Sequence, residues 1–160
     1  MKTNSKKKEY NFLGKVGKFN MSKVAVVYWS STGNTEAMAT EVAEGAKAKG
    51  AEVDLLETSD FDASKVEAYD AIAFGCPAMG AEVLEEDEFQ PMFDACKEKL
   101  SGKKIALFGS YGWGDGEWMQ SWEEDCKGAG AVLACNSVIC NEEPDDDAKA
   151  ACKALGEALA

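Results

Sequence analysis

Histidine and arginine are both absent from the 160 residues of this chain, and only three prolines are present. Without histidine there is no Ser-His-Asp or Cys-His catalytic arrangement, no histidine-ligated zinc and no imidazole proton shuttle. These absences exclude most hydrolase chemistry. With 46% hydrophobic and 29% charged residues, the composition is nevertheless that of a globular domain of ordinary size.

Positive charge is scarce over most of the chain. Seventeen lysines face 29 acidic residues, and the net charge of −12 makes nucleic acid and anionic membranes poor partners. Residues 1–20 differ, because six lysines and one acid give them +5 and leave −17 for residues 21–160. We predict that 1–20 form a basic extension, either a disordered arm or a product of start-codon choice, followed by one domain over 21–160. The extension lacks the apolar run of a signal peptide, so we expect a cytoplasmic protein.

Six cysteines are spread along the chain without a C-x-x-C pair, at positions 76, 96, 126, 135, 140 and 152. This spacing favours buried, reduced thiols over the alternatives of a zinc site or a disulfide. No metal is therefore assigned from the sequence.

Apolar runs rich in β-branched residues alternate with Ala/Glu/Lys-rich stretches of helical spacing. The strands are predicted at 24–29, 52–56, 72–75, 105–109 and 132–139, all but the second buried on both faces. The helices are predicted at 35–49, 89–100, 117–129 and 145–159. Residues 58–70 are too few and too polar for a full helix. The alternation predicts an α/β fold with a parallel sheet covered on both faces, in either of two familiar strand orders.

Ligands of such sheets bind beyond the carboxyl ends of the strands, so the loops there carry the functional hypotheses. The first loop, Ser30-Ser31-Thr32-Gly33-Asn34-Thr35, precedes a predicted helix and holds four hydroxyls. Hydroxyls, backbone N–H groups and a helix N-terminus together favour a phosphate site. The alternative is a plain capped turn, which needs only one Ser or Thr.

Two further loops follow the third and fourth strands. The loop at 77–82 contains Met79, which offers a polarizable face to a flat ring, although Met-Gly is weak evidence by itself. The loop at 110–116 alternates glycines with Tyr111 and Trp113, which indicates stacking on an aromatic ligand rather than a simple turn.

Together these loops resemble those of short-chain flavodoxins of the clostridial type, a family of FMN-binding electron carriers. The resemblance rests on Ser-x-Thr-Gly-Asn-Thr at 30–35, Met-Gly-x-Glu at 79–82 and Gly-Ser-Tyr-Gly-Trp-Gly-Asp-Gly at 109–116. It covers residues 21–160 in order and spacing. It implies a flavodoxin-like three-layer sandwich, with a five-stranded parallel sheet of order 2-1-3-4-5 between helices.

The resemblance also implies a set of FMN-binding residues. They are Ser30, Ser31, Thr32, Gly33, Asn34, Thr35, Ala78, Met79, Gly80, Ala81, Glu82, Ser110, Tyr111, Gly112, Trp113, Gly114, Asp115, Gly116 and Asn141.

Individual roles follow from the resemblance. The first loop would hold the phosphate, Met79 and Trp113 would pack on the two ring faces, and Glu82 would accept a hydrogen bond from flavin N3–H. Asp115 would lie near the pyrimidine edge, and the Gly80–Ala81 peptide would flip on one-electron reduction. Relatives often have Asp or Ser where this chain has Ala81, so the energy of the flip is specific to this chain.

The charge around these loops gives a separate reason to expect a low potential. Residues 77–91 and 109–122 contain no lysine, and their acids are Glu82, Glu85, Glu86, Asp87, Glu88, Asp115 and Glu117. An added electron enters a negative region, which predicts a depressed semiquinone/hydroquinone potential. The same acids predict transient, electrostatically steered complexes with redox enzymes that have basic docking surfaces. Alternatively, these acids are a solvated face that aids solubility.

Other functions remain as alternatives. An NAD(P)H-dependent FMN or quinone reductase would share the fold, but the chain has no arginine to hold a cofactor 2′-phosphate. A signalling receiver domain needs an acceptor aspartate where the chain has Gly75-Cys76-Pro77. A module without cofactor would leave the hydroxyl and aromatic loops unexplained. We expect an electron carrier rather than an enzyme, and a monomer, because no long amphipathic repeat is present.

Overall fold

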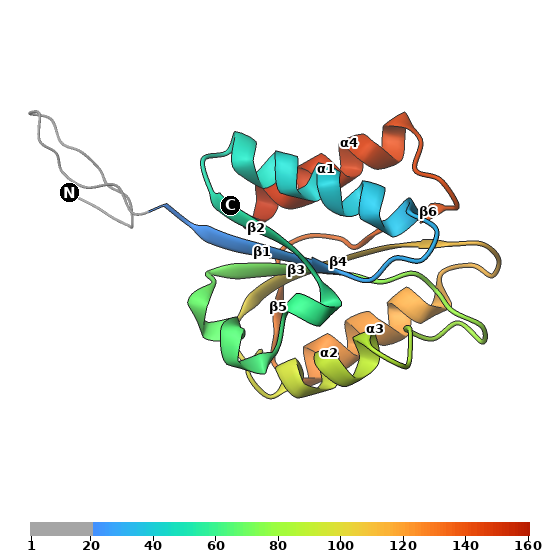
Figure 1. Cartoon of the computed structure of the whole chain (residues 1–160), viewed down its shortest axis with the longest axis horizontal. Coiled ribbons are helices and arrows are strands. Elements are labelled where there is room, and N and C mark those ends of the chain that lie inside the picture. Colours follow the sequence, from blue (N-terminus) through green and yellow to red (C-terminus); the bar gives the residue numbers. More distant parts are fainter. Residues whose placement is uncertain (1–20) are drawn as a thin grey trace, which may run out of the picture.

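The computed structural model describes residues 21–160, which form alternating strands and helices (Figure 1). The prediction made for residues 1–20 lies outside this range. The strands are β1 (Lys23–Tyr28), β2 (Glu52–Glu57), β3 (Ala71–Gly75), β4 (Lys104–Tyr111), β5 (Val132–Leu133) and β6 (Val138–Asn141). The helices are α1 (Asn34–Ala48), α2 (Phe89–Lys97), α3 (Glu117–Gly128) and α4 (Asp146–Leu159), with short 3-10 helices η1 (Thr58–Asp60) and η2 (Ala63–Ala68).

All strands of the sheet run parallel in the order β2-β1-β3-β4-β5, and β6 also pairs with β4. The predicted order 2-1-3-4-5 and the three-layer sandwich are confirmed. Figure 1 shows α1 and α4 on one face of the sheet and α2 and α3 on the other. The polar stretch before β3 forms only η1 and η2, as its composition predicted.

The fifth strand differs from the prediction, which placed one doubly buried strand at 132–139. The structure divides this run into β5 and β6, which pair with successive parts of β4 and are half-exposed. Asn136 and Ser137 interrupt the run, and the Ser137 hydroxyl donates to the Glu123 carboxylate on α3. Because this run lies at the edge of the sheet, its interruption removes backbone hydrogen bonds to β4 only.

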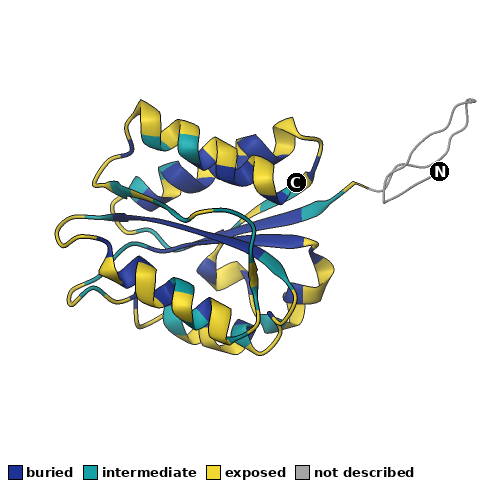
Figure 2. Cartoon of the chain, turned by 180° about the vertical axis from the view of Figure 1, so that it is seen from behind, coloured by how far each residue is buried: buried dark blue, intermediate teal, exposed yellow. Residues whose placement is uncertain are grey.

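The central strands divide the interior into two cores. Side chains alternate across a strand, so Val27 and Phe74 face α2 and α3, whereas Val26 and Ala73 face α1 and α4. Figure 2 shows the same division, with buried helix sides toward the sheet and exposed sides outward.

The two helix pairs are packed by different side chains. Gly45 on α1 and Gly156 on α4 let the two backbones touch, because a Cβ on either would lie 2.0 Å from a carbonyl oxygen of the other helix. Between α2 and α3 the contacts are aromatic instead, and the Trp122 ring lies 5.5 Å from Phe89 and 5.7 Å from Phe93, edge to face. One pair is therefore closely joined and the other is separated by large side chains.

All six cysteines are free thiols. Four are buried as predicted, but Cys135 and Cys140 are only half-buried, because they lie near the interrupted edge strand. Burial raises the pKa of the Cys126 and Cys152 thiols to about 12, which keeps them protonated and unreactive. Within residues 21–160, no helix is long and apolar enough to cross a membrane.

Candidate functional site

A pocket of about 250 Å³ lies where the carboxyl ends of β1, β3, β4 and β6 meet. This edge of a parallel sheet is where the fold places ligands. The pocket is lined by Ser30, Ser31, Thr32, Asn34, Thr35, Pro77, Ala78, Met79, Ser110, Tyr111, Gly112 and Glu142. All three loops that the sequence singled out thus contribute to one hollow.

The first loop turns from β1 into α1 around Gly33, whose φ of +98° favours glycine. The Ser30 hydroxyl oxygen accepts the backbone N–H groups of Gly33 and Glu36, each at 3.2 Å, and so fixes the turn. Thr35 is 1% exposed, and its Oγ1 has no hydrogen-bond partner among the described residues. Since the Ser30 hydroxyl already caps the turn, the Thr35 hydroxyl is surplus to capping.

The side chains around this loop are neutral or acidic. Among residues 21–160, no lysine lines the pocket. Glu36, in the first turn of α1, accepts a hydrogen bond of 3.1 Å from the Tyr28 hydroxyl. Burial, followed by the contact with Glu36, raises the pKa of Tyr28 to about 12, so the phenol remains a donor. Any anion here is held by neutral donors and the helix N-terminus.

The second loop is a tight hairpin. Met79 and Val83 exchange two backbone hydrogen bonds, of 2.8 and 3.1 Å, across the turn between them. Gly80 has a φ of +36° and Glu82 a φ of +59°, which is an uncommon conformation for a side chain other than glycine. Met79 is held toward the pocket while Gly80 and Ala81 are exposed at the tip.

Glu82 connects the second loop to the third. Its Oε1 accepts the backbone N–H of Trp118 at 3.3 Å, in the first turn of α3. Its Oε2 lies beside Gly114, where a Cβ would be only 2.5 Å away. The left-handed Gly114 therefore leaves room for this carboxylate.

The third loop is fixed to the end of β6. The Ser110 hydroxyl donates to the Glu142 carbonyl at 3.1 Å, and the Tyr111 carbonyl accepts both the Glu142 N–H and the Asn141 side-chain amide. Trp113 projects at the loop tip and is 66% exposed. Such a large exposed aromatic side chain beside a pocket is typical of a ligand-stacking residue.

The structure brings most of the predicted residues together, but not all of them to the pocket wall. Those outside the lining are Gly33, Gly80, Ala81, Glu82, Trp113, Gly114, Asp115, Gly116 and Asn141, all of which lie in or beside the three loops or at the end of β6. Pro77 and Glu142 line the pocket and were missed. Both belong to loops that follow strand ends, which is the signal that points to them.

One acid of the predicted negative rim, Glu85, binds the protein's own backbone. Glu85 is 6% exposed, and its carboxylate accepts the backbone N–H groups of Asp87, Glu88 and Phe89 at 2.7 to 2.9 Å, before and into α2. Burial alone would raise the pKa of Glu85, but these three donors outweigh it and lower the pKa. The exposed rim therefore excludes Glu85, whose charge stabilises the start of α2.

The site matches the chemistry of the FMN that the resemblance implies. An unpartnered buried hydroxyl, the free N–H groups of the first turn of α1 and three further hydroxyl side chains suit a phosphate ester. Met79 and Trp113 are apolar surfaces suited to a flat ring.

Known proteins match this chain over nearly all of the described range. The flavodoxin family model matches residues 26–155. The flavodoxin of Megasphaera elsdenii is 47% identical over 137 residues, which are 86% of this chain and 98% of the relative. The flavodoxin of Clostridium beijerinckii is 46% identical over 135 residues, covering 84% and 97%.

Solved structures agree with these sequence matches. The solution structure of two-electron reduced Megasphaera elsdenii flavodoxin has a TM-score of 0.79 and 48% identity, and the match covers 85% of this chain and 97% of that one. The pocket geometry, the strand order and the relatives lead to one conclusion: this chain belongs to the flavodoxin family of FMN-binding electron carriers.

Proposed function

We propose that this chain is a low-potential one-electron carrier, which holds FMN tightly and exchanges electrons with redox enzymes that present basic docking surfaces. Bound FMN supplies the capacity to take up and release single electrons. The observation that carries the proposal is a pocket whose described lining consists of neutral groups and Glu142, with no lysine.

The loops divide the binding of FMN between them. In this proposal residues 30–35 hold the phosphate, with the Thr35 hydroxyl gaining the partner it lacks. Met79 and Trp113 pack on the two ring faces, and Glu82 accepts the ring N3–H. The remaining predicted residues shape the loops around them, and the exposed Gly80–Ala81 peptide is free to reorient.

Charge is what lowers the potential. An electron added at the site meets carboxylates such as Glu82, Asp115 and Glu142, and the described lining of the pocket offers no lysine to offset them. One carboxylate at roughly 8 Å, with an effective dielectric constant of about 20, opposes the added charge by about 2 kcal/mol, or about 90 mV. Water around exposed side chains reduces this to a few tens of millivolts each.

A redox titration of the FMN-loaded chain tests this account. We expect the triple variant Glu86→Gln, Asp87→Asn, Asp115→Asn to raise the midpoint potential of the second one-electron step by about 80 mV. The matched control carries Glu67→Gln, Glu98→Gln and Glu157→Gln, exposed acids away from the three loops, and should shift it by less than about 20 mV. Equal potentials in wild type and the first variant would refute the electrostatic account.

The rate of electron transfer to a redox partner gives a second test. If basic partners are steered by the acidic rim, the bimolecular rate of electron transfer falls as ionic strength rises, and a rate independent of salt would contradict steering. Steady oxidation of NADPH by the FMN-loaded chain would instead favour the reductase alternative.

A further inference from the structure

A second hollow lies between α2 and α3 and shares no lining residue with the FMN pocket. It is a groove of about 540 Å³. Leu84, Trp118 and Trp122 form its buried floor, and Val83 and Ser121 are exposed at its sides. The aromatic side chains that separate α2 from α3 therefore leave an open hollow with a buried apolar floor, in contrast to the joined α1 and α4.

Within residues 21–160, the lining of the groove carries negative charge and no basic side chain. Glu82, Glu124 and Asp125 are its charged members. Within residues 21–160, neither Glu82 nor Glu124 forms an ion pair. An occupant that brings positive charge would meet two carboxylates without a counter-charge.

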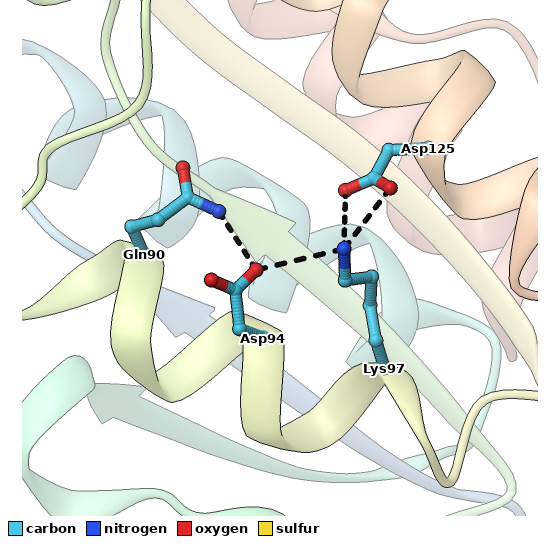
Figure 3. Close-up of polar contacts among 4 residues, drawn as sticks. All are labelled: Gln90, Asp94, Lys97 and Asp125. Atoms are coloured by element: carbon cyan, nitrogen blue, oxygen red, sulfur yellow. Dashed lines mark hydrogen bonds and ion pairs between the residues drawn. The ribbon is translucent and has the colours of Figure 1, made fainter.

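Lys97 on α2 already pairs with one of the carboxylates of the groove. Lys97 Nζ lies 2.9 and 3.0 Å from the two carboxylate oxygens of Asp125 and 3.6 Å from Asp94, which also accepts the Gln90 amide at 2.9 Å (Figure 3). This network joins α2 to α3 and balances the charge of Asp125. The rest of the groove stays negative.

The groove is also close to the FMN pocket. Trp118 lies on the groove floor, and its ring is 5.7 Å from that of Tyr111, which lines the pocket. Glu82 lines the groove and, through Gly114, contacts the third loop. A molecule seated in the groove is therefore separated from the pocket by a single layer of side chains.

Two buried side-chain polar atoms in the described part of the chain have no hydrogen-bond partner. One belongs to a lining residue of the FMN pocket and the other to a lining residue of the groove. Thr35 Oγ1 is in the FMN pocket, and the indole N–H of Trp122 is at the groove. An unpaired buried donor is costly in a protein that binds nothing beside it.

We propose that this groove is the docking site for a basic segment of an electron-transfer partner, which places an apolar side chain beside the exposed Val83 and lysine or arginine beside the exposed Glu124. The proposal rests on the proposed carrier function and specifies its contact surface. A second copy of this chain is a poor occupant, because residues 21–160 carry −17. The lysine-rich residues 1–20 are the competing occupant, and the test separates them from a partner.

The test measures how fast the reduced, FMN-loaded chain transfers electrons to cytochrome c, a basic one-electron acceptor, in stopped flow at low ionic strength. Glu124→Lys reverses charge at the groove, and Ser121→Trp fills it. The control is Glu157→Lys, the same charge change on α4, across the sheet from the groove. We expect both groove variants to slow the bimolecular rate about fivefold and the control less than twofold. FMN affinity should stay unchanged, and both midpoint potentials are measured so that a change in driving force is distinguished from a change in docking.

Each other outcome overturns the proposal in a recognisable way. Equal effects of Glu124→Lys and Glu157→Lys would show that only net charge matters. If the groove variants slow transfer only in a chain that starts at Met21, the chain's own residues 1–20 occupy the groove. If the wild type transfers electrons and neither variant slows it, docking is elsewhere and the carrier function stands. A wild type that cannot reduce the acceptor refutes the carrier function itself.

Discussion

The two helix pairs that cover the sheet are packed in opposite ways, one pair in close backbone contact and the other held apart. On one face, glycines bring α1 and α4 into backbone contact, and an ion pair of 3.8 Å joins Lys153 to Glu41. On the other face, stacked and edge-to-face aromatic side chains keep α2 and α3 apart and leave a groove. The closed face contributes stability and begins at the first loop, whereas the open face borders the second and third loops of the FMN pocket. Looser packing of α2 and α3 thus leaves a hollow beside two of the three loops.

The largest expected effect comes from a substitution that forces α1 and α4 apart. Gly45→Ala places a Cβ 2.0 Å from the Lys153 carbonyl oxygen, so α1 and α4 must separate, which costs about 3 kcal/mol of unfolding free energy. Urea unfolding measures it. Gly128→Ala on α3, where the added Cβ meets open space, serves as the matched control and should change stability by less than about 1 kcal/mol. Similar losses in both variants would mean that the helix contact is not tight.

The second largest effect on stability is expected from a substitution in the loop that precedes α2. Glu85→Gln replaces a carboxylate that accepts three backbone N–H groups with an amide, which should cost about 2 kcal/mol. Because the folded pKa of Glu85 is lowered, its contribution is present above the ordinary pKa near 4.5 and is lost as pH falls through the folded value. The difference between wild type and variant should therefore shrink below about pH 4.

Glu86→Gln is the control for this measurement, since Glu86 is exposed and is neighbour to Glu85. It should change the unfolding free energy by only a few tenths of a kcal/mol. A pH-independent difference between wild type and Glu85→Gln would show that the loss comes from packing rather than from the carboxylate charge.

The smallest effect concerns the wall between groove and pocket. Gly114→Ala should displace the Glu82 carboxylate and weaken FMN binding about tenfold, the loss of one charge-assisted hydrogen bond. Gly102→Ala has a similar left-handed φ but open space, so it should lose stability without losing FMN affinity. In a Glu82→Ala background, Gly114→Ala should weaken FMN binding no further, and an additive loss would contradict the role assigned to Gly114.

Sequence reasoning could predict the local features because each depends on a short stretch. The hydroxyl loop before α1 and the aromatic loop after β4 follow from neighbouring residues, whereas the strand order was implied by the resemblance to a known family. What it missed depends on contacts between distant segments. Glu85 turns inward because α2 begins two residues after Asp87, and the strand at 132–139 divides because Ser137 reaches Glu123 on α3. The groove depends on how far aromatic side chains separate two helices, which no single stretch encodes.

The neutral cradle at residues 30–35 also has a consequence for handling the protein. Bonds from hydroxyls and N–H groups to a phosphate do not depend on counterions in the way that lysine contacts do. Concentrated salt should therefore strip bound partners from an immobilised sample while the yellow colour stays on the column. Retention of the cofactor and release of the partner are then controlled by different solvent conditions.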